Sequence, residues 1–143
     1  MNSKIEKVLE FDKIRAQLAE YATSEKGKQM IKELPIEVEE KAIRNKIEET
    51  ADGVELLRLK QGIPIPRLKD ISFALKRLEL EAGLNGRELS DILRVLTTTH
   101  EVERFFEKVE EEEIALKRIP RLVEKLESIP EVTKELEASI RED

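Results

Sequence analysis

The spacing of the apolar residues constrains the fold of this chain most strongly. In two long stretches, about Glu37 to Lys60 and about Asn85 to Val109, apolar residues recur at intervals of three and four and hardly ever alternate. This is the pattern of one face of an α-helix. The first stripe is formed by Ile43, Ile47, Thr50, Val54 and Leu57, and the second by Ile92, Val95, Thr99, Val102, Phe106 and Val109. We therefore expect an all-α fold, a helical bundle in which two long antiparallel helices lie beside several short flanking helices.

Capping residues predict three short helices before the first long one. Ser3 with Glu6 forms a capping-box pattern that opens the first of them. Asp12 is expected to cap a second, whose face carries Ile14, Leu18 and Tyr21. Ser24 is expected to cap a third, which ends before Pro35 because the residue preceding proline avoids helical torsions.

The later helices have their own start and stop signals. Asp70 is expected to cap a helix that carries Ile71, Leu75 and Leu78 and stops at Gly83. Asn85 with Glu88 opens the second long helix. Pro120 and Pro130 stand where the first turn of a helix tolerates a missing amide donor, so two short helices should close the chain.

Gly62-Ile63-Pro64-Ile65-Pro66 is the main internal break, because prolines at this density forbid regular helix and favour extended backbone. It divides the chain into residues 1–61, the extended break 62–67 and residues 68–143, which we expect to share one core. The last helix carries Val132, Leu136 and Ile140 and runs to Asp143 without a stop signal. This ending favours the interpretation that the chain is a fragment of a longer protein.

Composition excludes several classes of protein. The 143 residues are 41% charged, and no stretch approaches the roughly 20 apolar residues that a membrane-spanning helix needs. Cysteine is absent, which rules out disulfides and thiolate metal sites. Lys4 and Glu6 stand where a secretory signal would carry its apolar stretch, so we expect a cytoplasmic location.

The distribution of charge argues against nucleic-acid binding by this chain alone. Residues 1–77 hold 16 Lys and Arg against 14 Asp and Glu, whereas residues 78–143 hold 10 against 18. Affinity for a phosphate backbone comes largely from a basic surface that releases counterions. The acidic second half would therefore repel DNA.

Three motifs superficially suggest chemistry, and each has a plainer explanation. His100-Glu101 resembles the opening of a zinc-binding helix, but the position of the second histidine holds Arg104. Gly27-Lys28 resembles a phosphate loop, but Ala22 stands where that loop requires a glycine. Glu110 to Glu113 point in four directions around a helix, so a frayed, solvated end is expected rather than a cation site. We therefore predict no catalytic, cofactor-binding or metal-ligating residue.

The densest basic cluster consists of Arg67, Lys69, Lys76 and Arg77. It could contact phosphate, but no aromatic platform for unpaired bases accompanies it, and scattered basic residues on a charged helical protein usually serve solubility. Phe105 and Phe106 are better explained as core contacts of the second long helix than as a stacking surface. No nucleic-acid-binding residue can be assigned from these patterns.

An ordered series of segments resembles the start of the second bacterial MutS paralogue. Leu9-Glu10-Phe11-Asp12-Lys13-Ile14-Arg15 is followed by Gln17-Leu18-Ala19-Glu20-Tyr21-Ala22, and then by Ser24 with Gly27-Lys28. Leu68-Lys69-Asp70-Ile71, Ala74-Leu75-Lys76-Arg77, the helix opened by Leu84 and Ile140-Arg141-Glu142-Asp143 come later in the same order. The resemblance spans nearly the whole chain, although its segments are packing and capping patterns rather than catalytic motifs.

The resemblance implies more than these residues show. Proteins of that family begin with helical core and lever segments, continue into a dimerising ATPase domain and often end in a nuclease domain. They are associated with suppressing homologous recombination on branched DNA and with sensing and splitting collided ribosomes. ATP and magnesium would belong to the parent protein, and no catalytic residue can be carried over to this chain. The expected partners are the remainder of the MutS-like chain, a second copy in a homodimer and, through the parent, branched DNA and the ribosome.

Two other functions remain open at this point. The chain could be a self-contained helical module that binds a partner protein or another copy of itself through its apolar stripes. It could also bind nucleic acid directly through Lys69, Lys76 and Arg77, with an affinity that falls steeply with salt. A reading frame that continues into a phosphate-loop motif would favour the lever fragment, and a stop codon after Asp143 would favour the module.

Overall fold

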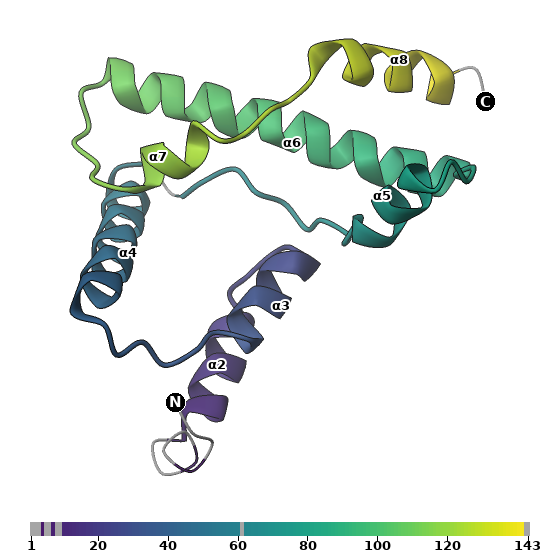
Figure 1. Cartoon of the computed structure of the whole chain (residues 1–143). Helices are drawn as coiled ribbons and strands as arrows, with labels where there is room; N and C mark the ends of the chain where they lie inside the picture. The colour runs from purple at the N-terminus through teal and green to yellow at the C-terminus, as the bar shows by residue number, and fades with distance from the viewer. Residues whose placement is uncertain (1–3, 5–6, 8–9, 61, 142–143) are drawn as a thin grey trace.

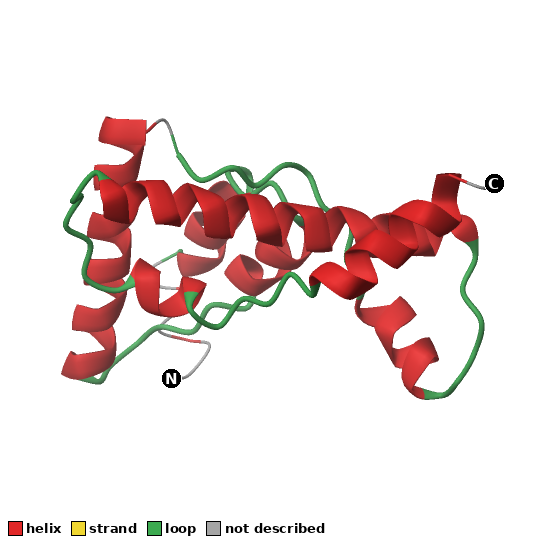
Figure 2. Cartoon of the chain, turned by 90° about the horizontal axis from the view of Figure 1, so that it is seen from above, coloured by secondary structure: helices red, strands yellow, loops and turns green. Residues whose placement is uncertain are grey.

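The computed structural model describes residues 4, 7, 10–60 and 62–141. These residues form helices joined by turns and irregular segments, and no strand occurs among them (Figures 1 and 2). This confirms the all-α fold class and the two long helices. The elements are α2 (Phe11–Ala19), α3 (Glu25–Lys32), α4 (Glu40–Lys60), α5 (Ser72–Glu79), α6 (Gly86–Glu111), α7 (Ile119–Val123) and α8 (Pro130–Arg141).

The two long helices, α4 and α6, do not run side by side. They approach each other near their C-terminal ends and point in different directions from there (Figure 1). Along the rest of its length α6 packs against α8, while α4 contacts α7. The predicted antiparallel packing of α4 on α6 is therefore not what the structure shows, because an apolar stripe specifies a buried face without specifying what covers it.

The core lies at the corner between α4 and α6. Leu56 of α4 is fully buried against Val102, Phe106 and Val109 of α6. Phe105 packs beside Phe106 with ring centroids 5.2 Å apart in an edge-to-face arrangement, which confirms both rings as core contacts. Partly buried apolar residues complete the cluster, namely Ile63, Ile114, Leu116, Ile119 and Val123.

The extended break holds the α2–α3 pair in place. Residues 63–71 form neither helix nor strand, as the prolines predict. The Thr23 hydroxyl donates to the carbonyl of Ile65 at 2.9 Å, and the Glu25 amide donates to the carbonyl of Leu68 at 3.0 Å. These bonds join the start of α3 to a segment about forty residues later in the chain. The division of the chain into residues 1–61, 62–67 and 68–143 stays a prediction.

Several predicted helix starts are confirmed. The Ser24 side chain accepts from the Gly27 amide at 3.0 Å and caps α3. Asn85 and Glu88 form the reciprocal capping box of α6. Pro120 lies in the first turn of α7, and α8 begins at Pro130.

Other predicted caps differ from the structure. Asp12 does not cap α2, which begins at Phe11 after Glu10 in a left-handed conformation (φ 52°) with no side-chain cap. Asp70 accepts from the Ser72 amide at 2.9 Å, so α5 starts one residue later than expected, and it ends at Glu79, well before Gly83. The predicted capping box of Ser3 and Glu6 lies outside the described residues.

The part of the chain that the structure describes contains no helix long and apolar enough to cross a membrane.

Candidate functional site

The carboxylate of Asp52 fixes the corner between α4 and the start of α7. Asp52 lies in the middle of α4 with a side chain only 5% exposed. Its Oδ1 accepts from the Lys117 amide at 2.9 Å, and its Oδ2 accepts from the amides of Arg118 and Ile119 at 2.7 and 2.9 Å. These are amides at the start of α7, which lack partners within that helix. A side chain from α4 thus caps a helix more than sixty residues away.

The environment of Asp52 favours its charged form. Burial of the carboxylate opposes ionisation, but the three backbone amides and the positive charge of Lys117 outweigh burial, so the pKa of Asp52 is lower than its usual value. A carboxylate that accepts several amide hydrogen bonds is a strong acceptor. At neutral pH, Asp52 is therefore ionised and accepts three charge-assisted hydrogen bonds from the amides of residues 117–119. We call this contact the Asp52 clamp.

Two ion pairs flank the Asp52 clamp. The guanidinium of Arg118 lies 3.5 Å from the carboxylate of Glu48, one turn before Asp52. Lys60, at the end of α4, pairs with Glu112, just after α6. Together with the Leu56 cluster, these contacts join α4, α6 and α7 at one corner.

The opposite side of α4 stays largely exposed in the described part of the chain. At 3.6 residues per turn, Asp52 and Leu56 lie on the side away from the predicted stripe. Ile47, Val54 and Leu57 of that stripe are 61%, 60% and 64% exposed, and Ile43 and Thr50 are also exposed. Asp52 and Leu56 are therefore the buried residues of α4, and the apolar stripe predicted to be the buried face is exposed instead.

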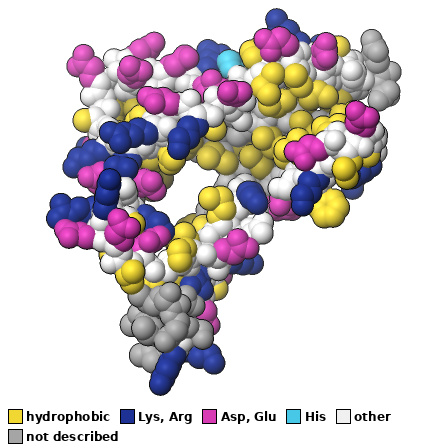
Figure 3. Space-filling view, viewed as in Figure 1, with side chains coloured by type: hydrophobic (Ala, Val, Ile, Leu, Met, Phe, Trp, Pro, Cys, Tyr) yellow, Lys and Arg dark blue, Asp and Glu magenta, His cyan; other side chains and the backbone are white. Residues whose placement is uncertain are grey.

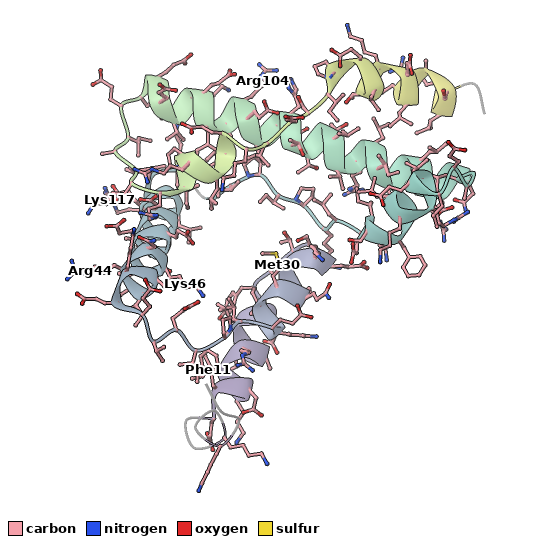
Figure 4. All side chains as sticks on the ribbon, viewed as in Figure 1. Phe11, Met30, Arg44, Lys46, Arg104 and Lys117 are labelled. Carbon is pink, nitrogen blue, oxygen red and sulfur yellow. The ribbon has the colours of Figure 1, made fainter. Side chains whose placement is uncertain are left out.

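An apolar groove of about 670 Å³ lies along this uncovered face. One wall is the α4 stripe, and the other comes from Phe11 of α2 and the segment Leu34-Pro35-Ile36. Lys46 points from α4 toward the groove, whereas Arg44 points away from it (Figure 4). Figure 3 shows hydrophobic side chains around the hollow between α4 and the α2–α3 pair. The groove is suited to an apolar helix face rather than to a polar small molecule.

The three candidate chemical motifs are not brought together. His100 is exposed on α6, Gly27 and Lys28 lie in the first turn of α3, and the acidic run follows α6. The Lys28 ammonium donates to the carbonyl of Ala19 at 3.0 Å, which ties α3 to α2. Within residues 4, 7, 10–60 and 62–141, no group of three His, Asp or Glu side chains is arranged to hold a metal ion.

The acidic run has a structural role that its sequence did not suggest. Glu112 pairs with Lys60 of α4, and Glu113 adopts a left-handed conformation (φ 57°) that turns the chain after α6. All four glutamates are exposed at the end of α6, as expected of a solvated helix end, and the ion pair of Glu112 adds a contact that the sequence did not predict. The carboxylates do not converge on one point.

The predicted basic cluster is divided between two places. Lys69 lies 3.4 Å from the Glu25 carboxylate, and with Arg67 it lines a shallow, mixed-polarity hollow of about 540 Å³ beside α3. Arg77 lies 2.6 Å from the Glu88 carboxylate and also donates to the carbonyl of Gly83 at 2.7 Å. Lys69 thus joins the extended segment to α3, and Arg77 joins α5 to α6, which weakens the interpretation of the cluster as a phosphate-binding patch.

Asp52 is the residue that sequence reasoning missed. The available signal was its position, because it is the acidic residue one turn before Leu56 on the side of α4 opposite the stripe. In a chain with 41% charged residues, such an acidic residue is indistinguishable from a solvated one. Its partners are 65 to 67 residues away and share no local pattern with it.

Comparison with known proteins places the chain in a family. No family model matches it. Endonuclease MutS2 of Pediococcus pentosaceus is 43% identical over 140 residues, which cover 98% of the chain. The proteins of the same name from Latilactobacillus sakei and Enterococcus faecalis are 43% and 39% identical over all 143 residues. The chain spans about 18% of the length of these relatives. It therefore belongs to the MutS2 family, as an N-terminal segment.

Proposed function

We propose that this chain is a non-catalytic lever of a MutS2 endonuclease, a helical segment that transmits displacement between other parts of the protein. The observation that carries the proposal is the corner at which the Asp52 carboxylate and the Leu56 cluster join α4, α6 and α7. A packed corner of this kind moves as a unit, because packed cores deform little and shift between discrete arrangements.

The dimensions of the two long helices suit a lever. With 21 and 26 residues, α4 and α6 extend about 31 and 39 Å from the corner at 1.5 Å per residue. A small rotation at the corner would become a displacement of several ångströms at the far ends. In the complete protein, such a movement could couple nucleotide state to a distant nucleic-acid contact.

The chemistry of the complete protein belongs, in this proposal, to the polypeptide outside this chain. The relatives are named endonucleases, and ATP with magnesium would bind in the part that this segment does not include. We propose branched DNA and the collided ribosome as the targets of the whole protein, with suppression of recombination and ribosome rescue as its roles. A cytoplasmic location follows from those targets.

The first test measures ATP turnover by the isolated chain. We expect none above the buffer rate. Stoichiometric hydrolysis that a single substitution within residues 1–143 abolishes would contradict the non-catalytic role.

The second test measures coupling in the complete MutS2 protein. Asp52→Ala should leave ATP affinity unchanged and weaken the dependence of ATP hydrolysis on nucleic acid, because the lever loses its fixed corner. Asp12→Ala, a substitution of an exposed aspartate on α2, is the control. If the Asp52→Ala protein folds and its ATP hydrolysis still depends on nucleic acid as in the natural protein, the lever proposal is contradicted.

A second candidate function is the self-contained interaction module. The uncovered stripe of α4 favours it, because a large exposed apolar patch marks a contact surface. The reading frame distinguishes the two, since a lever requires a continuing polypeptide. Direct nucleic-acid binding ranks last, because Lys69 and Arg77 are already ion-paired.

A further inference from the structure

We propose that the Asn85–Gly86 step, where α6 begins, is a site of spontaneous isoaspartate formation, and that the ion pair between Arg77 of α5 and Glu88 of α6 controls its rate. This inference goes beyond the lever and does not depend on it. It rests on the sequence of the step, on the exposure of its two residues and on the bonds that hold the start of α6.

The residue that follows an asparagine controls how readily that asparagine reacts. The backbone nitrogen of the following residue can attack the side-chain carbonyl carbon, and glycine hinders this attack least because it has no Cβ. The chain has three asparagines, and glycine follows only Asn85. Of the three, Asn85 is therefore the one whose sequence most favours the reaction.

Both residues of the step are accessible. Asn85 and Gly86 are exposed, and a Cβ added at Gly86 would meet nothing within 4 Å beyond its neighbours in the helix. The amide of Gly86 lies in the first turn of α6, where amides have no acceptor within the helix. Neither crowding nor a helical hydrogen bond therefore shields the two reacting atoms, the Gly86 nitrogen and Cγ of Asn85.

The reaction needs only water and hydroxide. The Gly86 nitrogen loses its proton to hydroxide and bonds to Cγ of Asn85, the bond from Cγ to Nδ2 breaks, and ammonia leaves with a proton from water. Water then opens the resulting succinimide ring. Attack of water on Cγ gives aspartate, whereas attack on the backbone carbonyl carbon gives isoaspartate, in which the chain runs through Cβ and Cγ.

The capping box of α6 holds the step in an unreactive geometry. Oδ1 of Asn85 accepts from the Glu88 amide at 2.8 Å, and the Asn85 amide donates to Oε1 of Glu88 at 3.1 Å. Closing the succinimide ring requires rotation about the Cα–C bond of Asn85, away from its extended ψ of 171°. This rotation displaces Gly86 from the first turn of α6. The reaction therefore starts from the state in which that turn is open.

The ion pair between Arg77 and Glu88 stabilises the closed state. Nη1 of Arg77 lies 2.6 Å from Oε2 of Glu88, and Nη2 donates to the carbonyl of Gly83 at 2.7 Å. The Glu88 carboxylate thus binds α5 with one oxygen and the Asn85 amide with the other. Without the pair, Glu88 is no longer held from α5, so the box opens more often and the reactive state is more populated.

The two products differ in their effect on α6. Aspartate caps a helix about as well as asparagine, so that product keeps the box. Isoaspartate adds a carbon to the backbone at the cap, and its free carboxylate is attached directly to Cα, where it no longer reaches the Glu88 amide in the same geometry. Isoaspartate formation therefore removes the box permanently and loosens the joint between α5 and α6.

The test is the accumulation of isoaspartate in the 143-residue chain at neutral and mildly alkaline pH. Mass spectrometry of proteolytic peptides, with an enzymatic assay for isoaspartate, locates and measures the product. We expect it at position 85 and not at Asn45, which lies inside α4 and precedes a lysine. The rate should rise with hydroxide concentration and should be slower in buffer than in urea, where the box is absent.

Two variants test control by the ion pair and the box. Arg77→Gln removes the pair and leaves Glu88 in the box, and it should raise the rate in buffer about two- to fivefold. Glu88→Ala removes both contacts and should raise the rate about five- to thirtyfold, the range that corresponds to a lost cap. Glu101→Ala, at an exposed glutamate of the same helix, is the matched control and should leave the rate unchanged.

Gly86→Ala tests the chemistry separately. The added methyl group has room in the fold, so this variant should keep its helical circular dichroism and lose isoaspartate formation at position 85. Absence of isoaspartate there in both the natural chain and Glu88→Ala would overturn the site. A folded Arg77→Gln chain that reacts at the natural rate would overturn control by the ion pair. None of these results bears on ATP turnover or its coupling, so the lever fails or stands separately.

Discussion

At the level of single residues, Asp52 joins two helical parts of the structure that lie more than sixty positions apart in the chain. It is buried, charged and bonded to three amides of a distant helix. Leaving such donors without an acceptor costs far more than an ordinary hydrogen bond contributes. The stability of the corner should therefore depend on this carboxylate.

Replacing Asp52 by alanine should lower the free energy of unfolding by about 2–4 kcal/mol, because three partly buried amides lose a charged acceptor. Urea denaturation followed by circular dichroism measures the change. Asp12→Ala, the control at an exposed aspartate, should cost under about 1 kcal/mol. Equal losses of unfolding free energy in the two variants would show that the Asp52 hydrogen bonds stabilise the fold no more than an exposed aspartate does.

The clamp should also make stability depend on pH in the acid range. The folded pKa of Asp52 is lower than the unfolded value of about 3.9, so its contribution is complete above pH 4 and is lost as the pH falls through the folded value. The difference in unfolding free energy between the natural chain and Asp52→Asn should stay constant from about pH 7 to 5 and shrink below about pH 4. A difference that grows on acidification would contradict the assigned direction.

At the level of helices, the sequence correctly predicted those helix starts that are fixed by interactions within a few residues. Ser24, Asn85 with Glu88, Pro120 and Pro130 mark helix starts because a cap or a first-turn proline acts within four residues. Asp12 failed because a left-handed residue, Glu10, starts α2 without any side-chain cap. Such a backbone turn has no signal in a single sequence.

The capping box of α6 offers a test at this scale. Asn85→Ala should lower the free energy of unfolding by about 1 kcal/mol, since the Glu88 amide loses its acceptor. Asn85→Ser keeps an acceptor and should cost a few tenths. Thermal denaturation of both variants measures the difference. Equal melting temperatures of Asn85→Ala and Asn85→Ser would show that the capping box does not stabilise α6.

At the scale of the whole molecule, the sequence predicted the helices but not their arrangement. The stripe of α6 is largely buried as expected, whereas the stripe of α4 faces outward and its other side carries the contact. Periodicity identifies an apolar face, but which element covers it depends on residues sixty or more positions away. The same reason hid the Asp52 site, because a capping carboxylate and its amides share no motif when they come from different helices.

The proposed lever requires that α4 and α6 form one rigid body joined at this corner. The chain lacks cysteine, so spin labels at Arg44→Cys and Arg104→Cys, both exposed side chains on the two long helices (Figure 4), would be the only ones present. Double electron–electron resonance, with labelled chain diluted into excess unlabelled chain, reports the distance between them. We predict a single narrow distribution that broadens in Asp52→Ala; a broad or multimodal distribution in the chain with Asp52 intact would contradict the rigid corner.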